Sequence, residues 1–282
     1  MQSIVMQMNT TVNRIYIFCA EDTNNSARRL EEDLSALSLS SQTPPVTTRF
    51  VIANLDNINS AFNRIKQDCL ENDIKPLLHF DFHASAQHGL VIRNGFYLSW
   101  EWIGFRCREV NEICNCKLGV VMACCFGLYA IRAVHITERV PFQYLIGSQE
   151  IIYQGVDIDE SFIPFYTALF ETLSFEAALQ NLPNKFKPFY AEKLLFVSLA
   201  KYIKNGTMGK GFHQRKEGLI TNLVESGLYP TVENLKIWRS HIKDTLKLDA
   251  DGVQELIDKY AAVFLGHKSD IKVDDLLGLI EE

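Results

Sequence analysis

The sequence of 282 residues lacks several features that would place it in a large class of proteins. No stretch reaches the ~18 apolar residues that a membrane-spanning helix needs. The formal net charge is −6, and without a basic excess nothing suggests a nucleic-acid-binding surface. The start of the chain has neither the basic residues nor the apolar core of a secretory signal. We therefore expect a cytoplasmic protein that binds neither a membrane nor nucleic acid directly.

Two further absences concern metals and nucleotides. The seven cysteines are odd in number and follow no disulfide framework, so reduced thiols are expected. The spacing of Cys107, Cys114 and Cys116 lacks the repeated ligand pairs of a structural zinc site, which disfavours a metal. No glycine-rich turn follows the first strand pattern, where Cys19 precedes Ala-Glu-Asp, and this argues against a dinucleotide-binding domain.

The sequence does contain an alternation of strand and helix patterns. Residues 13–20, 46–55, 77–82, 118–124 and 142–148 read as strands. Helical patterns follow at 25–37, 58–70, 100–112, 127–134, 161–173 and 175–182, and Ser99 is a suitable N-cap for the third of these. The alternation predicts a mostly parallel sheet flanked by helices on both faces.

Two segments depart from this alternation. Two β-rich runs lie on either side of Asn94 and Gly95, which predicts an inserted β-hairpin. Two prolines interrupt the pattern at 183–188, and the rest of the chain reads as helical. We therefore predict an α/β domain over 1–183 and a helical C-terminal region over 184–282, with a regulatory or structural role.

Two of the predicted strands end on reactive side chains. PLLHFDFH (76–83) ends on His83, and LGVVMACCFG (118–127) contains Cys124 and Cys125. Because parallel strands end along one edge of a sheet, a histidine after one strand can meet a cysteine after another. A thiol with a neighbouring base is the arrangement of a cysteine nucleophile.

The residues alone leave other interpretations open. Buried cysteines often serve only for packing. Cys125 competes with Cys124 for the nucleophile's role, since strand alternation turns only one of them toward His83. Asp81 shares the strand parity of His83, which would allow it to orient a histidine, but a solvated carboxylate is the simpler expectation. The backbone N–H groups of Cys124 and of Ala84, which follows His83, are the natural donors of an oxyanion hole.

Residues 77 to about 179 resemble the CHAT-type caspase-like cysteine peptidases, which are relatives of caspases and separase. The strand ending at His83 resembles the strand that carries the family's catalytic histidine, and residues 89–102 are similar to its hairpin and following helix start. The segment around Cys124 resembles the family's Ser-Ala-Cys-x-Ser-Gly, with Met122 in place of the first serine. The family's glycine after the histidine is Ala84 here. The segment from Leu145 to Asp157 resembles the wall of the specificity pocket.

The resemblance implies a caspase-like fold and a cysteine endopeptidase. Cys124 follows alanine, as the family's nucleophile does, and His83 is the implied base. The implied substrate-binding residues are Ser148, Gln149, Glu150 and Asp157. Because Glu150, Asp157 and Asp159 lie in this region and no arginine does, a basic residue before the cut is expected, although a solvated acidic loop fits equally well.

The expected function is therefore cleavage of a protein or peptide substrate, in a bacterial defence system, such as an antiviral one, or in a cell-death system. The mechanism requires no cofactor or metal. The helical C-terminal region is expected to bind a regulatory protein partner or to pack on the α/β domain. The main alternative is a catalytically inactive caspase-like module that binds other proteins.

Overall fold

The computed structural model describes residues 12–37, 46–93, 96–207, 209–246, 250–269, 271–274 and 276. These residues form two compact units. The first comprises the described residues up to Ala191 together with Phe264–Gly266, and the second the described residues of Glu192–Val263 and those from His267 onward. Each unit is described separately below.

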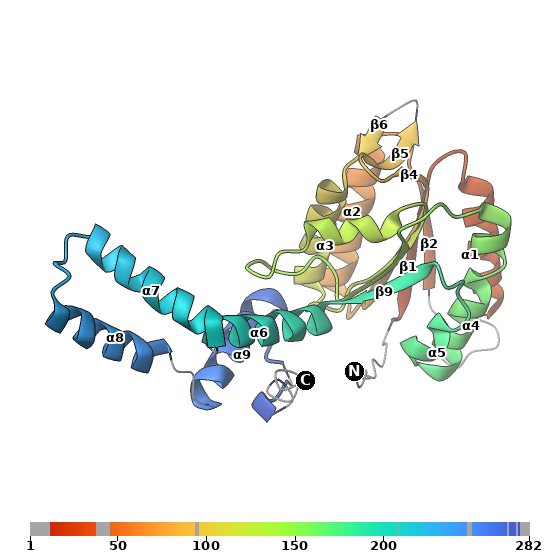
Figure 1. The fold of residues 1–282 in the computed structure, drawn as a ribbon. Helices are drawn as coiled ribbons and strands as arrows, with labels where there is room; N and C mark the ends of the chain where they lie inside the picture. The colour runs from red at the N-terminus through yellow and green to blue at the C-terminus, as the bar shows by residue number, and fades with distance from the viewer. Residues whose placement is uncertain are drawn as a thin grey trace. The chain divides into compact units, whose positions relative to one another are not determined.

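The first unit is built around a six-stranded sheet with the order β2-β1-β3-β7-β8-β9 (Figure 1). All neighbouring strands run parallel except β9, which pairs antiparallel with β8. The α/β class and the mostly parallel sheet predicted from the sequence are thus confirmed. The strands are β1 (Arg14–Cys19), β2 (Val46–Val51), β3 (Pro76–Asp81), β7 (Gly119–Ala123), β8 (Tyr144–Ser148) and β9 (Phe186–Tyr190).

Helices cover both faces of this sheet, as its buried apolar strands require (Figure 1). One face packs against α2 (Leu55–Glu71), α3 (Trp100–Ile113) and the 3₁₀-helix η1 (Gly127–Ala133). The other packs against α1 (Asn24–Leu37), α4 (Phe162–Thr172) and α5 (Phe175–Leu179), and the short π-helix η2 (Gln154–Asp159) precedes α4. The predicted N-cap is confirmed, since Ser99 Oγ accepts a hydrogen bond of 3.1 Å from the Trp102 N–H.

A second, three-stranded antiparallel sheet follows β3 directly. It consists of β4 (His83–Ser85), β5 (Gly89–Arg93) and β6 (Phe96–Leu98). The strands β5 and β6 confirm the predicted hairpin, while its expected tip at Asn94 and Gly95 lies outside the described residues. His83 was expected to end the preceding strand, but it begins β4, because the chain leaves the large sheet after Asp81.

The second unit is helical. It contains α6 (Ala191–Thr207) from Glu192 onward, α7 (Gly209–Glu225), α8 (Val232–Leu246) and α9 (Ala250–Phe264) up to Val263. The prediction of helices throughout 184–282 is wrong at residues 186–190, which form β9. The longer of the two segments that make up the first unit runs to Ala191 and so includes β9. Among the described residues, no helix combines the length and apolar character needed to cross a membrane.

Candidate functional site

The sheet topology brings His83 and Cys124 to the same edge. β3 and β7 are parallel neighbours, and the last residues in register are Asp81 and Ala123. Cys124 comes one residue after this pair and His83 two residues after it, at the carboxyl ends of adjacent strands. Neighbouring strands lie about 4.8 Å apart, so the two backbones leave the sheet side by side.

The strand order singles out the same edge on independent grounds. The chain passes from β1 outward to β2 and then returns to place β3 on the other side of β1. In open parallel sheets, ligands bind outside the carboxyl ends of the strands at such a reversal. The loop after β1 and the residues after β3 therefore flank the expected position of a binding crevice.

Asp22, in the loop after β1, is a functional candidate that the sequence interpretation missed. Its carboxylate lies 3.5 Å from Nε2 of His83, and both side chains are 64% exposed. Thr23 holds this loop in place, because its hydroxyl donates a 2.6 Å hydrogen bond to the Asp81 carbonyl at the end of β3. The only signal in the sequence was an acidic residue after the first strand, and nothing in the sequence alone places that residue beside His83.

Cys124 is enclosed by the protein. It is 1% exposed and belongs to the apolar cluster on the α2 and α3 face. Burial, followed by the influence of Cys125 and Asp81, raises the pKa of the Cys124 thiol well above its ordinary value. Although both residues are described by the structure, no hydrogen bond joins the Cys124 thiol to the His83 imidazole. The thiol is therefore protonated and shielded from solvent in this conformation.

Cys125 has a different environment. It is half-buried and packs toward the opposite face of the sheet, as strand alternation requires. Its sulfur accepts a hydrogen bond of 3.4 Å from the Ile152 N–H and lies 3.7 Å from the Ile152 carbonyl oxygen. Cys125 thus fastens the loop that follows β8 to the turn that follows β7.

The turn after Cys124 has an unusual backbone. Phe126 adopts a left-handed conformation with φ of 59°, which is uncommon for a bulky residue and costs of order 1 kcal/mol. Its N–H donates a 3.2 Å hydrogen bond to the Glu150 carbonyl, and Gly127 N–H donates one of 3.3 Å back to the Cys124 carbonyl. The predicted helix beside the cysteine is present, but as the tighter 3₁₀ form of η1.

Ala84 lies in β4, opposite Leu90. Its φ is not positive, so this backbone conformation is open to alanine. The glycine that follows the histidine in the CHAT-type peptidases is therefore not required here for conformational reasons.

The predicted substrate-binding residues separate into two groups. Ser148, Gln149 and Glu150 lie at the end of β8, beside the turn after Cys124. Ser148 is fully buried, and its Oγ accepts a 2.9 Å hydrogen bond from the Glu150 N–H, so it shapes the loop. Gln149 and Glu150 are exposed, and among the described residues no cation pairs with the Glu150 carboxylate.

Asp157 and Asp159 already have basic partners. Burial alone would raise the pKa of Asp157, but bonds of 2.7 Å each from Lys185 Nζ and the Tyr153 N–H outweigh it and lower the pKa. Asp159 forms a 2.6 Å ion pair with Arg29. Of the three acids expected to attract a basic substrate residue, only Glu150 has no ion-pair partner among the described residues, and its backbone carbonyl contacts the turn after Cys124.

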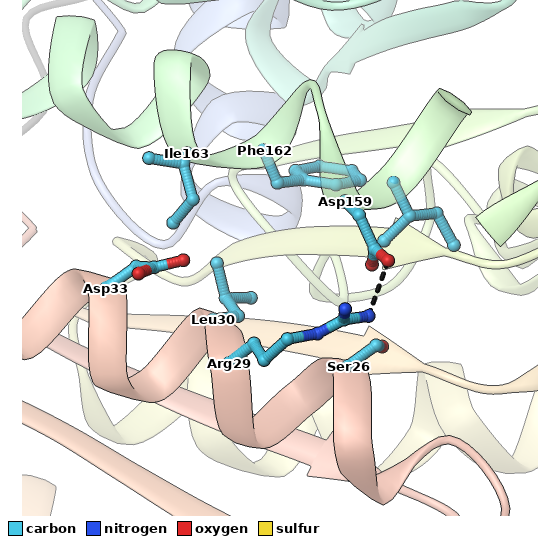
Figure 2. Close-up of a pocket in the computed structure, with 8 residues that line it drawn as sticks. Ser26, Arg29, Leu30, Asp33, Asp159, Phe162 and Ile163 are labelled. Atoms are coloured by element: carbon cyan, nitrogen blue, oxygen red, sulfur yellow. Dashed lines mark hydrogen bonds and ion pairs between the residues drawn. The ribbon is translucent and has the colours of Figure 1, made fainter. Parts of the chain in front are cut away.

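The Arg29–Asp159 pair borders a pocket of about 150 Å³ between α1 and α4, and Figure 2 shows the two side chains facing each other across it. The lining residues include neither His83 nor Cys124. Ser26, another lining residue, is hydrogen-bonded to the buried carboxyl of Asp81. The expectation of a solvated Asp81 is wrong, because its side chain points into the sheet face covered by α1.

Cys107, Cys114 and Cys116 were not expected to bind a metal, because of their spacing in the sequence. The structure places all three in buried positions in or near α3. Burial raises the thiol pKa of each. Within the described part of the chain, no group of three or more potential ligand side chains is arranged to hold a metal.

No protein-family model matches the sequence, and no curated protein matches it significantly.

Proposed function

We propose that the chain is a cysteine endopeptidase of the CHAT-type, caspase-like class, with Cys124 as nucleophile and His83 as base. The observation that carries the proposal is the placement of both residues directly after adjacent, in-register parallel strands. The carboxyl edge next to a reversal of strand order is also where α/β proteins bind ligands. The proposed substrate is a protein, and the proposed setting is a bacterial defence or cell-death system.

The chemistry needs only groups of this chain. The Cys124 sulfur attacks the scissile carbonyl carbon while its proton passes to His83, and the carbonyl electrons move to oxygen. The N–H groups of Cys124 and Ala84 are the proposed donors to that oxygen. His83 then gives the proton to the leaving amine, and water hydrolyses the resulting thioester to release the acid and restore the thiol. Asp22 would orient the imidazole through its carboxylate, which lies 3.5 Å from Nε2 of His83.

The buried thiol fits a peptidase that is held inactive until a trigger rearranges the turn after β7. Activation would have to expose Cys124 and bring its sulfur within hydrogen-bonding distance of His83. The same burial favours a second candidate function. A caspase-like module that only binds other proteins would also keep this cysteine enclosed, protonated and without a contact to His83.

A proteome-wide cleavage profile separates the two functions. Cells producing the native protein are compared with cells producing Cys124→Ala and with cells producing Cys125→Ser, which retains a hydrogen-bonding group toward Ile152. We expect new peptide termini with the native protein and with Cys125→Ser, and their loss with Cys124→Ala. Identical termini in all three samples would remove the peptidase and leave the binding module.

A further inference from the structure

Three side chains form a continuous stripe along η1. In a 3₁₀-helix, residues three apart lie directly above one another, so Tyr129 and Arg132 share one side of η1. Phe126, the residue before η1, extends this side because its ring contacts the ring of Tyr129. The rings of Phe126 and Tyr129 are 6.0 Å apart, and the Arg132 guanidinium lies 4.2 Å from the centre of the Tyr129 ring. The stripe begins two residues after Cys124.

The far end of the stripe meets the segment that follows His83. Arg132 Nη1 donates a 2.9 Å hydrogen bond to the carbonyl of Ala86, three residues after His83. The stripe therefore links the turn that carries the proposed nucleophile to the loop that carries the proposed base. Both aromatic rings are partly exposed, and the guanidinium group is at the surface.

The charge of Arg132 is fixed in place but not neutralised. Stacking on Tyr129 and the bond to Ala86 hold the guanidinium, yet within the described residues no carboxylate forms an ion pair with it. Arg93, a similarly exposed arginine in the adjacent hairpin, is in contrast paired with Glu21 at 3.4 Å. A cation held by neutral partners keeps donors available for an incoming anion.

We propose that Arg132 recognises an acidic side chain of the bound substrate, with Phe126 and Tyr129 supporting the peptide between that side chain and the cut. Six residue steps separate Phe126, just before η1, from Arg132, which corresponds to about 12 Å at the rise of a 3₁₀-helix. An extended peptide covers this distance in about four residues. The acidic residue accordingly lies about three or four positions from the scissile bond, away from the unpaired Glu150 at the other end of the stripe. This assignment rests on the proposed peptidase function.

Binding, rather than cleavage, tests the assignment without requiring an active thiol. The full chain carrying Cys124→Ala is immobilised and exposed to ten-residue peptides in which one position at a time is fixed as Asp, Glu, Gln or Lys. We expect Asp and Glu to be preferred over Gln about three- to fivefold at one position, the strength of a partly exposed ion pair. The preference should weaken at 1 M salt.

Variants at Arg132 identify the group responsible. Arg132→Gln can still donate to Ala86 but should lose the preference, and Arg132→Glu should reverse it toward Lys at the same position. Arg93→Gln, the matched control, should leave the preference intact, and the Tm of each variant checks its folding. No bound peptide, no acidic preference, or a preference that persists in Arg132→Gln would overturn the assignment. Failure of the peptidase itself would appear separately, as cleavage that does not depend on Cys124.

Discussion

Two buried side chains of β3, His79 and Asp81, have pKa values that burial shifts in opposite directions. Burial lowers the pKa of His79 to about 3, so its imidazole is neutral and hydrogen-bonds the Tyr166 hydroxyl at 2.8 Å. Burial also raises the pKa of Asp81 to about 7, helped by the nearby charges of Asp159 and Asp22. Both groups therefore link the stability of the fold to pH, with opposite signs.

The Asp81 contribution can be isolated by Asp81→Asn. Its pKa of about 7 in the folded protein lies above the ordinary aspartate pKa of 3.8, so the folded state holds this proton more tightly than the unfolded chain. The contribution of Asp81 to the free energy of unfolding is largest at low pH. It decreases as pH rises from about 4 to 7, by up to ~4 kcal/mol in total. Urea unfolding at pH 5 and pH 8.5 should show Asp81→Asn gaining stability relative to the native protein at the higher pH.

The quantity to compare is the difference in free energy of unfolding between Asp81→Asn and the native protein at each pH. His79 makes the free energy of unfolding depend on pH with the opposite sign, but it does so equally in both proteins, so its effect cancels in the difference. Asp73→Asn, whose side chain is 91% exposed, is the control and should show the same pH dependence as the native protein. A difference between Asp81→Asn and the native protein that does not change with pH would contradict the buried, protonated state of Asp81.

The turn that carries Cys124 is held by close backbone contacts between η1 and β8. A Cβ atom at Gly147 would lie 2.5 Å from the Leu128 nitrogen and 2.7 Å from the Gly127 carbonyl carbon. Both are backbone atoms, which cannot turn aside as a flexible side chain can. Glycine at 147 therefore permits η1 to press against the end of β8 and to enclose the thiol.

Gly147→Ala should separate these elements. We expect a loss of about 1–3 kcal/mol in the free energy of unfolding, the usual cost of overpacking a filled interior. Alkylation of Cys124 by iodoacetamide, followed by mass spectrometry, should become faster. Gly155→Ala provides the matched control, since a Cβ there meets nothing within 4 Å. Equal stability and equal alkylation in the two variants would show that this contact does not enclose the thiol.

The sequence predicted most elements of the first unit because their apolar periodicity is regular. It missed β9, because Pro188 and the neighbouring lysines resemble an interdomain seam, yet proline is tolerated on an edge strand such as this one. It also missed β4, whose three residues show no periodicity. Asp22 was missed because only the pairing of β1 with β3 brings the loop after β1 to His83. The burial of Cys124 depends on tertiary packing, which strand periodicity does not report.

The first unit is completed by a segment from near the end of the chain. Phe264 is fully buried, and its carbonyl accepts a 2.9 Å hydrogen bond from the Val140 N–H. Leu265 is also buried, and Gly266 lies against Arg139 and Cys116 with a positive φ of 82°. The sheet-containing unit is thus discontinuous in sequence, and a simple division into an N-terminal domain and an appended C-terminal region does not describe it.

This discontinuity predicts that the end of α9 stabilises the unit that holds His83 and Cys124. Phe264→Ala should lower the free energy of unfolding by about 3–5 kcal/mol, as expected when a buried phenylalanine is truncated. Val263→Ala changes the preceding side chain, which is 42% exposed, and should alter stability by less than about 0.5 kcal/mol. Guanidinium unfolding of both variants measures the difference between their free energies of unfolding. A chain ending at residue 191 lacks Phe264 and should likewise be less stable than the full chain. Equal effects of the two substitutions would mean that Phe264 is not part of the core of the first unit.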